Sequence, residues 1–357
     1  MTKRLWGYSF HSVKGGVGKS TLAVHWALHL ARSWPQMPVY LLDMDLTGTS
    51  LGDVLPLHAP RWTGEGEEGN PVLGLRRPAD GWLERQYVQD RMAWRDEYLR
   101  GAAQEQMAAT HIPFLNDYLL FHPVDWRNSA DLDPRHLSWR LEDGPGDLRV
   151  LPSSALPKDV ERIVPVVFDE YYAGFLEGRC ESLLDTLVSD SAEDVAVVVD
   201  APPTIPGLSR AVISLGLRLG RRHTKLPLAE GGTIPPRLEA TDVSWRAALV
   251  ATPDLQDIRA AARWYEYTTR EERETVRLLL NRMPTGNPDQ AAAQAKRILT
   301  DALRESYPLL GDMDPLWVQD DPALQNFRRE CPASSWSLAL PGLSSLPQPA
   351  DGLRGPK

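Results

Sequence analysis

Residues Val13–Thr21, with the sequence VKGGVGKST, connect two predicted elements of different kinds. The apolar run Leu5–Phe10 before them predicts a β-strand, and the spacing of apolar residues over Ser20–Ala31 predicts an amphipathic helix. Glycines at such a junction let backbone N–H groups turn toward a phosphate, and the helix presents its positive N-terminal end to the same anion. A glycine-rich turn without function is the alternative, but strand, loop and helix in this order favour a phosphate-binding loop.

The rest of the chain repeats the alternation of short apolar runs and longer helical patterns. This alternation is typical of an α/β fold, and we expect a doubly wound, mostly parallel sheet with helices on its faces. Helices are predicted at Val167–Val188 and Leu255–Thr269. Further strands are predicted at Val39–Leu42, Leu148–Leu151, Val195–Val199, Ala247–Ala251, Val276–Leu280 and Leu316–Val318.

The pattern divides the chain into a core and two additions. Residues 1–51 and 148–330 form the predicted nucleotide-binding core, and residues 52–147 are a Trp-rich insertion that we expect to be a helical or irregular cap, with its best helix over 81–100. The tryptophans of the insertion would form either a small core of its own or a surface for a partner. The C-terminal extension, 331–357, is rich in Pro, Gly and Ser and is expected to be loose.

Composition narrows the class of protein. The chain has 357 residues and a net charge of −9, which argues mildly against coating nucleic acid or an anionic membrane. Its two cysteines, Cys180 and Cys331, form no CxxC motif, so a disulfide scaffold is not expected. Without a transmembrane run or a signal peptide, the cytoplasm is the expected location.

The loop has a second lysine, Lys14, in addition to the usual Lys19. This pattern, KGGVGKS, resembles the deviant Walker A motif of the ParA/MinD family of ATPases. The resemblance implies that ATP and Mg²⁺ bind here, and that Lys14 crosses a nucleotide-sandwiched homodimer to the partner's phosphates, much as an arginine finger acts in trans. A solvated lysine at the loop edge is the alternative for Lys14. The loop chemistry assigns the nucleotide phosphates to Gly15, Gly16, Val17, Gly18, Lys19, Ser20 and Thr21, with Ser20 also on Mg²⁺.

Three aspartates follow predicted strands. Asp43 and Asp45 come after Val39–Leu42, and Asp200 ends the most apolar run and precedes Ala-Pro-Pro. The resemblance implies that Asp45 orients the attacking water as part of switch I, that Asp43 supports Mg²⁺-bound water, and that Asp200 is the Walker B carboxylate of switch II. Simple capping aspartates are the alternative.

Candidate base-site residues follow the later strands. The family places an Asn-Arg pair, here Asn281 and Arg282, at the adenine edge, and an asparagine amide offers the donor and acceptor that adenine needs. Pro253 and Asp321 match family loops that close the base site. Ordinary turn residues would explain the same positions.

The resemblance therefore implies a slow, Mg²⁺-dependent ATPase that acts as a dimeric switch on a protein partner. DNA binding through the basic cluster at 218–225 stays open, and the C-terminus has no basic amphipathic helix for a membrane. An ATPase subunit of a multi-protein defence or signalling complex is the alternative, with the insertion docking an effector; a nucleotide-binding protein without hydrolysis is a third reading. A related iron–sulfur carrier would need a closely spaced cysteine pair, which the sequence lacks because Cys180 and Cys331 are far apart.

Overall fold

We describe a computed structural model of the chain. The described residues are 3–47, 51–65, 71–76, 114–121, 138–154, 157–189, 191–220, 236–269, 272, 275–284, 287–303 and 315–320, with the single residues 343, 346, 348 and 349. Among the helices of this part of the chain, none has both the length and the apolar character needed to cross a bilayer.

Strands and helices alternate through most of the described chain. The strands are β1 (Arg4–Ser12), β2 (Val39–Asp43), β3 (Leu57–Glu65), β4 (Pro71–Arg76), β5 (Trp139–Leu141), β6 (Leu148–Leu151), β7 (Val195–Pro203), β8 (Asp242–Ala251), β9 (Val276–Met283) and β10 (Leu316–Gln319). The helices are α1 (Lys19–Ser33), α2 (Leu51–Val54), α6 (Pro157–Val167), α7 (Ala173–Ser189), α8 (Leu208–Gly220), α9 (Pro236–Glu239), α10 (Leu255–Tyr267) and α12 (Pro288–Leu303), with a π-helical turn η1 (Asp117–Phe121) and a 3₁₀ turn η2 (Glu170–Tyr172).

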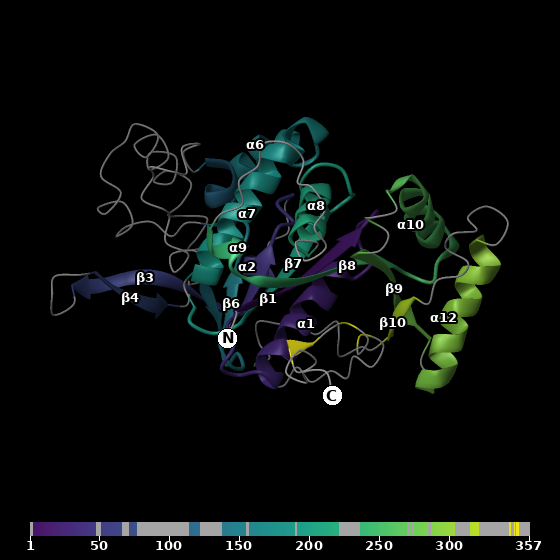
Figure 1. Ribbon diagram of the computed structural model, residues 1–357, viewed down its shortest axis with the longest axis horizontal. Helices are drawn as coiled ribbons and strands as arrows, with labels where there is room; N and C mark the ends of the chain where they lie inside the picture. Colours follow the sequence, from purple (N-terminus) through teal and green to yellow (C-terminus); the bar gives the residue numbers. More distant parts are fainter. Residues whose placement is uncertain are drawn as a thin grey trace.

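One sheet runs through the molecule, with the strand order β10-β9-β8-β1-β7-β2-β6-β5-β3-β4 (Figure 1). All neighbours from β10 to β6 pair in parallel, whereas β5, β3 and β4 pair in antiparallel fashion at one end. The central strands β1 and β7 are buried almost throughout, as expected for a parallel sheet covered on both faces. The predicted α/β class with a mostly parallel sheet is confirmed.

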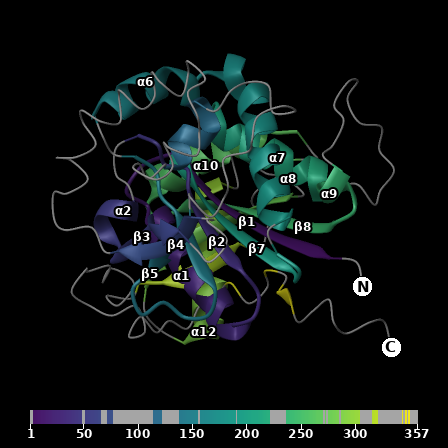
Figure 2. The ribbon, with the colours of Figure 1, turned by 90° about the vertical axis from the view of Figure 1, so that its left-hand side faces the viewer.

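Alternate residues of β1 and β7 belong to different cores, because side chains point to opposite faces along a strand. Tyr8 and Val198 pack with α1 on one face, whereas Leu5 and Val197 pack with α7 and α8 on the other. A third cluster joins α10 and α12 to β8 and β9. The two views of the ribbon show α1 on the side of the sheet opposite α7 and α8 (Figures 1 and 2).

Trp245 of β8 fixes the distance between α8 and the sheet. A Cβ atom on Gly7 of β1 would lie 1.9 Å from Cε3 of Trp245, and one on Gly216 of α8 would lie 2.1 Å from its Cδ1. Both positions must therefore lack a side chain, because the indole fills the space on either side. The indole Nε1 atom donates a hydrogen bond to Ser9 Oγ at 3.2 Å, which joins β8 to β1 near the start of the phosphate-binding loop.

Each predicted strand of the core is present, and β6 has the predicted bounds. The single helix expected over Val167–Val188 is wrong: the chain forms the end of α6, the 3₁₀ turn η2 and then α7. The carboxylate of Asp169 accepts a hydrogen bond from Tyr171 N and favours this turn over a continuous helix. The described part of the insertion adds β3, β4 and β5 to the sheet, and the helix predicted over 81–100 lies outside the described residues.

Candidate functional site

The loop between β1 and α1 has the backbone of a phosphate cradle. Gly16 and Gly18 have φ values of +79° and +87°, which residues other than glycine rarely adopt. A Cβ atom on Gly18 would also lie 2.3 Å from Nδ2 of Asn281, so no larger residue fits there. Because α1 begins at Lys19, its free N–H groups and its positive end face the space above the loop.

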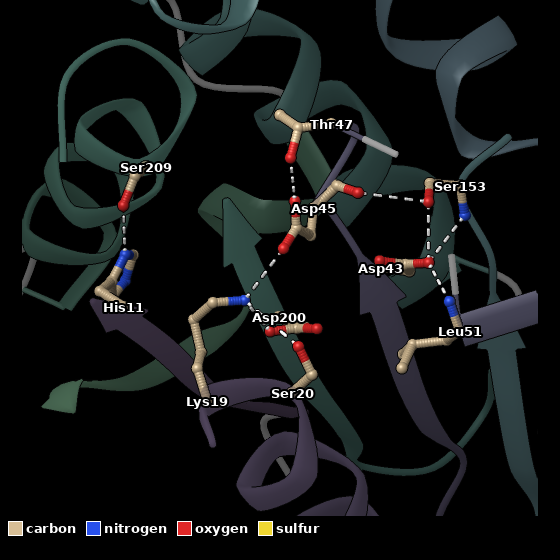
Figure 3. A network of polar contacts seen from close by, with 10 residues as sticks. All are labelled: His11, Lys19, Ser20, Asp43, Asp45, Thr47, Leu51, Ser153, Asp200 and Ser209. Atoms are coloured by element: carbon tan, nitrogen blue, oxygen red, sulfur yellow. Dashed lines mark hydrogen bonds and ion pairs between the residues drawn. The ribbon is translucent and has the colours of Figure 1, made fainter. Parts of the chain in front are cut away.

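Lys19 lies at the centre of a polar cluster (Figure 3). Its Nζ atom makes a buried ion pair with Asp200 Oδ1 and lies 3.6 Å from Asp45 Oδ2. Burial disfavours the ammonium, but the carboxylates of Asp200 and Asp45 outweigh it and raise the pKa of Lys19. The Ser20 hydroxyl is hydrogen-bonded to the same Asp200 carboxylate. The fold thus brings together four of the predicted residues, which come from α1, β7 and the loop after β2.

Asp43 lies beside this cluster because β2 and β7 are neighbours and Asp43 is directly opposite Asp200 in the register. Its Oδ2 atom accepts hydrogen bonds from Leu51 N at 2.8 Å, Ser153 Oγ at 2.8 Å and Ser153 N at 3.2 Å. Burial and the nearby Asp200 charge nevertheless raise the pKa of Asp43 to about 7. The site therefore holds a carboxyl group that changes its charge near neutral pH.

Two contacts of the site involve residues that the sequence did not single out. The hydroxyl of Thr47 donates a hydrogen bond to Asp45 Oδ1 at 2.6 Å, and Ser153 holds Asp43. Ser153 follows β6, the parallel neighbour of β2, so the rule that carboxyl ends of parallel strands converge could have found it. Thr47 carries no such signal, because its role depends on how the loop after β2 turns.

His11 connects the base of the P-loop to the segment after β7. Its Nδ1 atom shares a hydrogen bond with Ser209 Oγ at 2.7 Å, and its Nε2 atom shares one with Ser9 Oγ at 2.8 Å. Burial, together with the nearby Lys19 ammonium, lowers the pKa of His11 to about 3, so the imidazole is neutral at physiological pH. Its complete burial and its two serine partners indicate that this histidine has a packing role.

Lys14 lies apart from this cluster. Its side chain is 44% exposed, and its Nζ atom is 2.9 Å from Asp257 Oδ1 in the first turn of α10. The two lysines of the loop therefore have separate partners.

Among the candidate base-site residues that the structure describes, Asn281 contacts the phosphate-binding loop. Asn281 is buried at the end of β9 and donates from Nδ2 to the carbonyl of Val17 at 2.8 Å, and its Oδ1 atom has no hydrogen-bond partner among the described residues. Arg282 is exposed and has a φ of +60°, and Pro253 is half-buried at the start of α10. Asp321 lies outside the described residues.

Parts of this chain are similar to known proteins. Residues 8–120 match a family model described as ParA, the NUBPL iron-transfer P-loop NTPase. The iron–sulfur cluster carrier protein of Bacillus subtilis strain 168 is 32% identical over 174 residues, which are 48% of this chain and 42% of the relative. The match thus spans about two fifths of the relative's length.

Solved structures of similar proteins cover more of the chain. The septum site-determining protein MinD of Pyrococcus horikoshii OT3, complexed with Mg-ADP, is 14% identical, with 94% of this chain and 89% of that chain covered and a TM-score of 0.45. The ParA family ATPase of Chlorobium tepidum TLS is 15% identical, with 91% and 88% covered and a TM-score of 0.44. The stretch matched by the family model contains the loop with both lysines, Asp43 and Asp45, so the similarity to ParA P-loop NTPases includes this part of the candidate site.

Proposed function

We propose that this protein binds ATP with Mg²⁺, dimerises around the nucleotide and hydrolyses it slowly. Hydrolysis would change its affinity for a protein partner. The observation that supports this most directly is the meeting of Lys19, Asp45 and Asp200 at the N-terminus of α1. Burying three such charges together is costly for a fold that only needs stability. A triphosphate and a metal would give each of these charges a partner.

The backbone N–H groups of residues 15–21 would surround the phosphates, with Lys19 on the β- and γ-phosphates and Thr21 on the α-phosphate. The donor set fits Mg²⁺, because the Ser20 hydroxyl and the carboxylates of Asp43 and Asp200 are hard oxygen ligands on adjacent elements. The metal, when bound, neutralises charge on the β- and γ-phosphates. Lys19 would then exchange its contact with Asp200 for the phosphates.

In the proposed reaction Asp45 orients a water molecule in line with the γ-phosphorus. The water oxygen forms a bond to phosphorus while the bond to the β–γ bridging oxygen breaks. A proton of the water passes to an oxygen of the transferred phosphoryl group, and ADP leaves with the electron pair of the broken bond. Thr47 holds the Asp45 carboxylate through its 2.6 Å hydrogen bond, so the orientation of this carboxylate is set within the loop after β2. Lys19 from one subunit and Lys14 from the other offset the charge that develops.

The adenine would bind against the end of β9, closed by Arg282, Pro253 and Asp321. Asn281 has a buried carbonyl oxygen without a partner among the described residues, and a purine amino group would satisfy it. Its Nδ2 atom already holds the P-loop, so binding of the base and the shape of the phosphate cradle are connected through one side chain.

The described part of the basic cluster gives little support for DNA binding. Arg218, the described member of the basic cluster, has its guanidinium paired with Glu177 at 2.9 Å and Glu181 at 2.8 Å. An arginine held by two carboxylates offers little net charge to phosphates. A partner in cell positioning is the first proposal, and an effector of a defence or signalling complex is the second.

An iron–sulfur carrier is a further candidate, because the curated relative has that name. The cysteines argue against it. Cys180 is buried in α7, and burial raises the pKa of its thiol to about 12, which disfavours the thiolate that a cluster needs. Cys331 is 151 positions further on in the sequence and lies outside the described residues. Iron and sulfide analysis after anaerobic reconstitution tests the candidate, and a bound cluster would support it.

The switch is tested by the solution mass of Asp45→Ala, measured by light scattering with Mg-ATP and with Mg-ADP. We expect a dimer with ATP only, and a monomer when Lys14→Ala is added. A monomer in both conditions, with ATP shown to be bound, would mean that Lys14 does not act across a homodimer. Equal phosphate release by the wild type and Asp45→Ala would instead support nucleotide binding without hydrolysis.

A further inference from the structure

Asp257 divides its two carboxylate oxygens between two different loops. Oδ1 lies 2.9 Å from Lys14 Nζ in the P-loop, and Oδ2 accepts a hydrogen bond from the Thr252 hydroxyl at 2.5 Å. The Asp257 side chain is only 14% exposed, whereas that of Lys14 is 44% exposed. The carboxylate is therefore the fixed member of the pair, and the lysine is the member that can move.

The local structure explains why Asp257 is fixed. It lies in the first turn of α10, where Asp254 caps the helix by accepting from Gln256 N at 2.7 Å. Thr252, between β8 and this cap, also accepts from Asp254 N at 3.3 Å. A short turn with these hydrogen bonds holds Asp257 in one place relative to the sheet.

Among the described residues, Lys14 has no polar contact besides the one with Asp257. It precedes Gly15 and Gly16, both exposed, and a Cβ atom built on either glycine would meet nothing within 4 Å. A lysine has a flexible stem with a compact charge, and can exchange one anion for another by rotating its side chain. Lys14 can thus leave Asp257 without any change in the core around Lys19.

This arrangement keeps the carboxyl group of Asp257 ionised. Its partial burial opposes ionisation, but the hydrogen bonds from Thr252 and Lys14 prevail and keep the pKa of the carboxyl below its usual range. An acceptor of a single negative charge thus competes for Lys14 with any phosphate group that reaches the loop.

We propose that Asp257 is a positioning residue that holds Lys14 on its own subunit until the triphosphate of a second subunit displaces it. This inference rests on the proposed function, in which Lys14 acts across the dimer. Breaking the Lys14–Asp257 pair is then part of the free energy of dimerisation, and the pair weakens the dimer. Because a triphosphate carries more charge than one carboxylate, the exchange favours the dimer when ATP is bound.

The sign of the effect distinguishes this role from a structural one. In the Asp45→Ala background with saturating Mg-ATP, Asp257→Asn should tighten the dimer roughly two- to five-fold, as expected for a partly exposed ion pair. A carboxylate that merely supports the fold would weaken the dimer when removed. Asp257→Glu should restore the parent affinity, and Thr252→Val should give a smaller tightening. Asp301→Asn is the matched control, since it removes an exposed carboxylate paired with Arg297 on α12.

A second measurement follows Lys14 directly in the nucleotide-free monomer. Acylation of Lys14 by an N-hydroxysuccinimide ester, followed by mass spectrometry, should be roughly two- to five-fold faster in Asp257→Asn and unchanged in Asp301→Asn. If the parent protein, Asp45→Ala, stays monomeric with bound Mg-ATP, the proposed function and this inference are overturned together. A parent that dimerises while Asp257→Asn changes neither affinity nor acylation would overturn only the role of Asp257. Faster acylation without tighter dimerisation would also overturn it.

Discussion

Lys19 Nζ lies against Asp200 Oδ1, so the P-loop and the end of β7 are joined by an ion pair that is almost wholly out of contact with solvent. Lys19→Met would leave Asp200 charged and buried, which should lower the free energy of unfolding by about 3–5 kcal/mol. Asp200→Asn should cost less, because Lys19 keeps Asp45 at 3.6 Å. Urea unfolding without nucleotide measures both changes.

The double variant separates the pair from its surroundings. Lys19→Met with Asp200→Asn should cost less than the two single changes added together, by about 1–3 kcal/mol, because the second change removes the charge that the first leaves unpaired. Strict additivity would show that the two side chains do not stabilise each other in solution.

Thr204 offers a test of strain in the segment after β7. It is exposed and has a φ of +78°, which is unfavourable for a β-branched residue, while its N–H donates to Ser12 O at 2.9 Å. Thr204→Gly should raise the free energy of unfolding by about 0.5–2 kcal/mol, since relief of the strain exceeds the added freedom of the unfolded chain. Thermal or urea unfolding would detect the change.

Thr204→Val is the matched control, because it keeps the branched side chain and the backbone geometry. It should not stabilise the protein. If Thr204→Gly is as stable as the wild type or less stable, the left-handed conformation is not a source of strain.

The parts of this fold that the sequence predicted are those with strong local patterns. Val195–Val199 is an uninterrupted apolar run because β7 is covered on both faces, and VKGGVGKST can form few structures other than a turn before a helix. The three-residue β5, Trp139–Leu141, is too short for a pattern of its own. The Ala- and Gln-rich α12 was not predicted, because the buried face of its first half consists of Ala291 and Ala295, which differ little in type from the exposed alanines beside them.

The candidate site likewise contains residues that the sequence could place and residues that it could not. Asp43, Asp45 and Asp200 could be placed together from the sequence, because carboxyl ends of adjacent parallel strands converge at one edge. Asp257 could not be placed beside Lys14, since 243 positions separate them and their contact depends on how α10 packs beside the loop. Thr47 and His11 are similar cases, because their roles depend on which side chains the fold brings next to them.

His11 should make stability depend on pH. Its folded-state pKa of about 3 is below the ordinary value of 6.5, so the unfolded chain binds a proton that the folded protein excludes. Its contribution is fully present above pH 6.5 and is lost as the pH falls from there toward 3. Between pH 7 and pH 5 the wild type should lose about 1–2 kcal/mol more than His11→Gln does, measured by urea unfolding at each pH.

Ser209→Ala serves as the control for this prediction. It removes one hydrogen-bond partner of His11 without adding or removing a titrating group, so it should lower stability similarly at both pH values. If wild type and His11→Gln lose stability in parallel as the pH falls, the imidazole is accessible to protons in the folded state.

Thr47 should affect turnover without affecting binding. Its hydroxyl donates to Asp45 Oδ1 at 2.6 Å, and a hydrogen bond to a charged group contributes enough to account for a five- to tenfold effect, so Thr47→Val should lower phosphate release at saturating Mg-ATP by about that factor. Nucleotide affinity should stay the same, because Thr47 is outside the phosphate loop. Thr47→Ser keeps the donor and should retain most of the wild-type rate. A serine variant as slow as the valine variant would mean that the methyl group, and not the hydrogen bond to Asp45, is what the reaction requires.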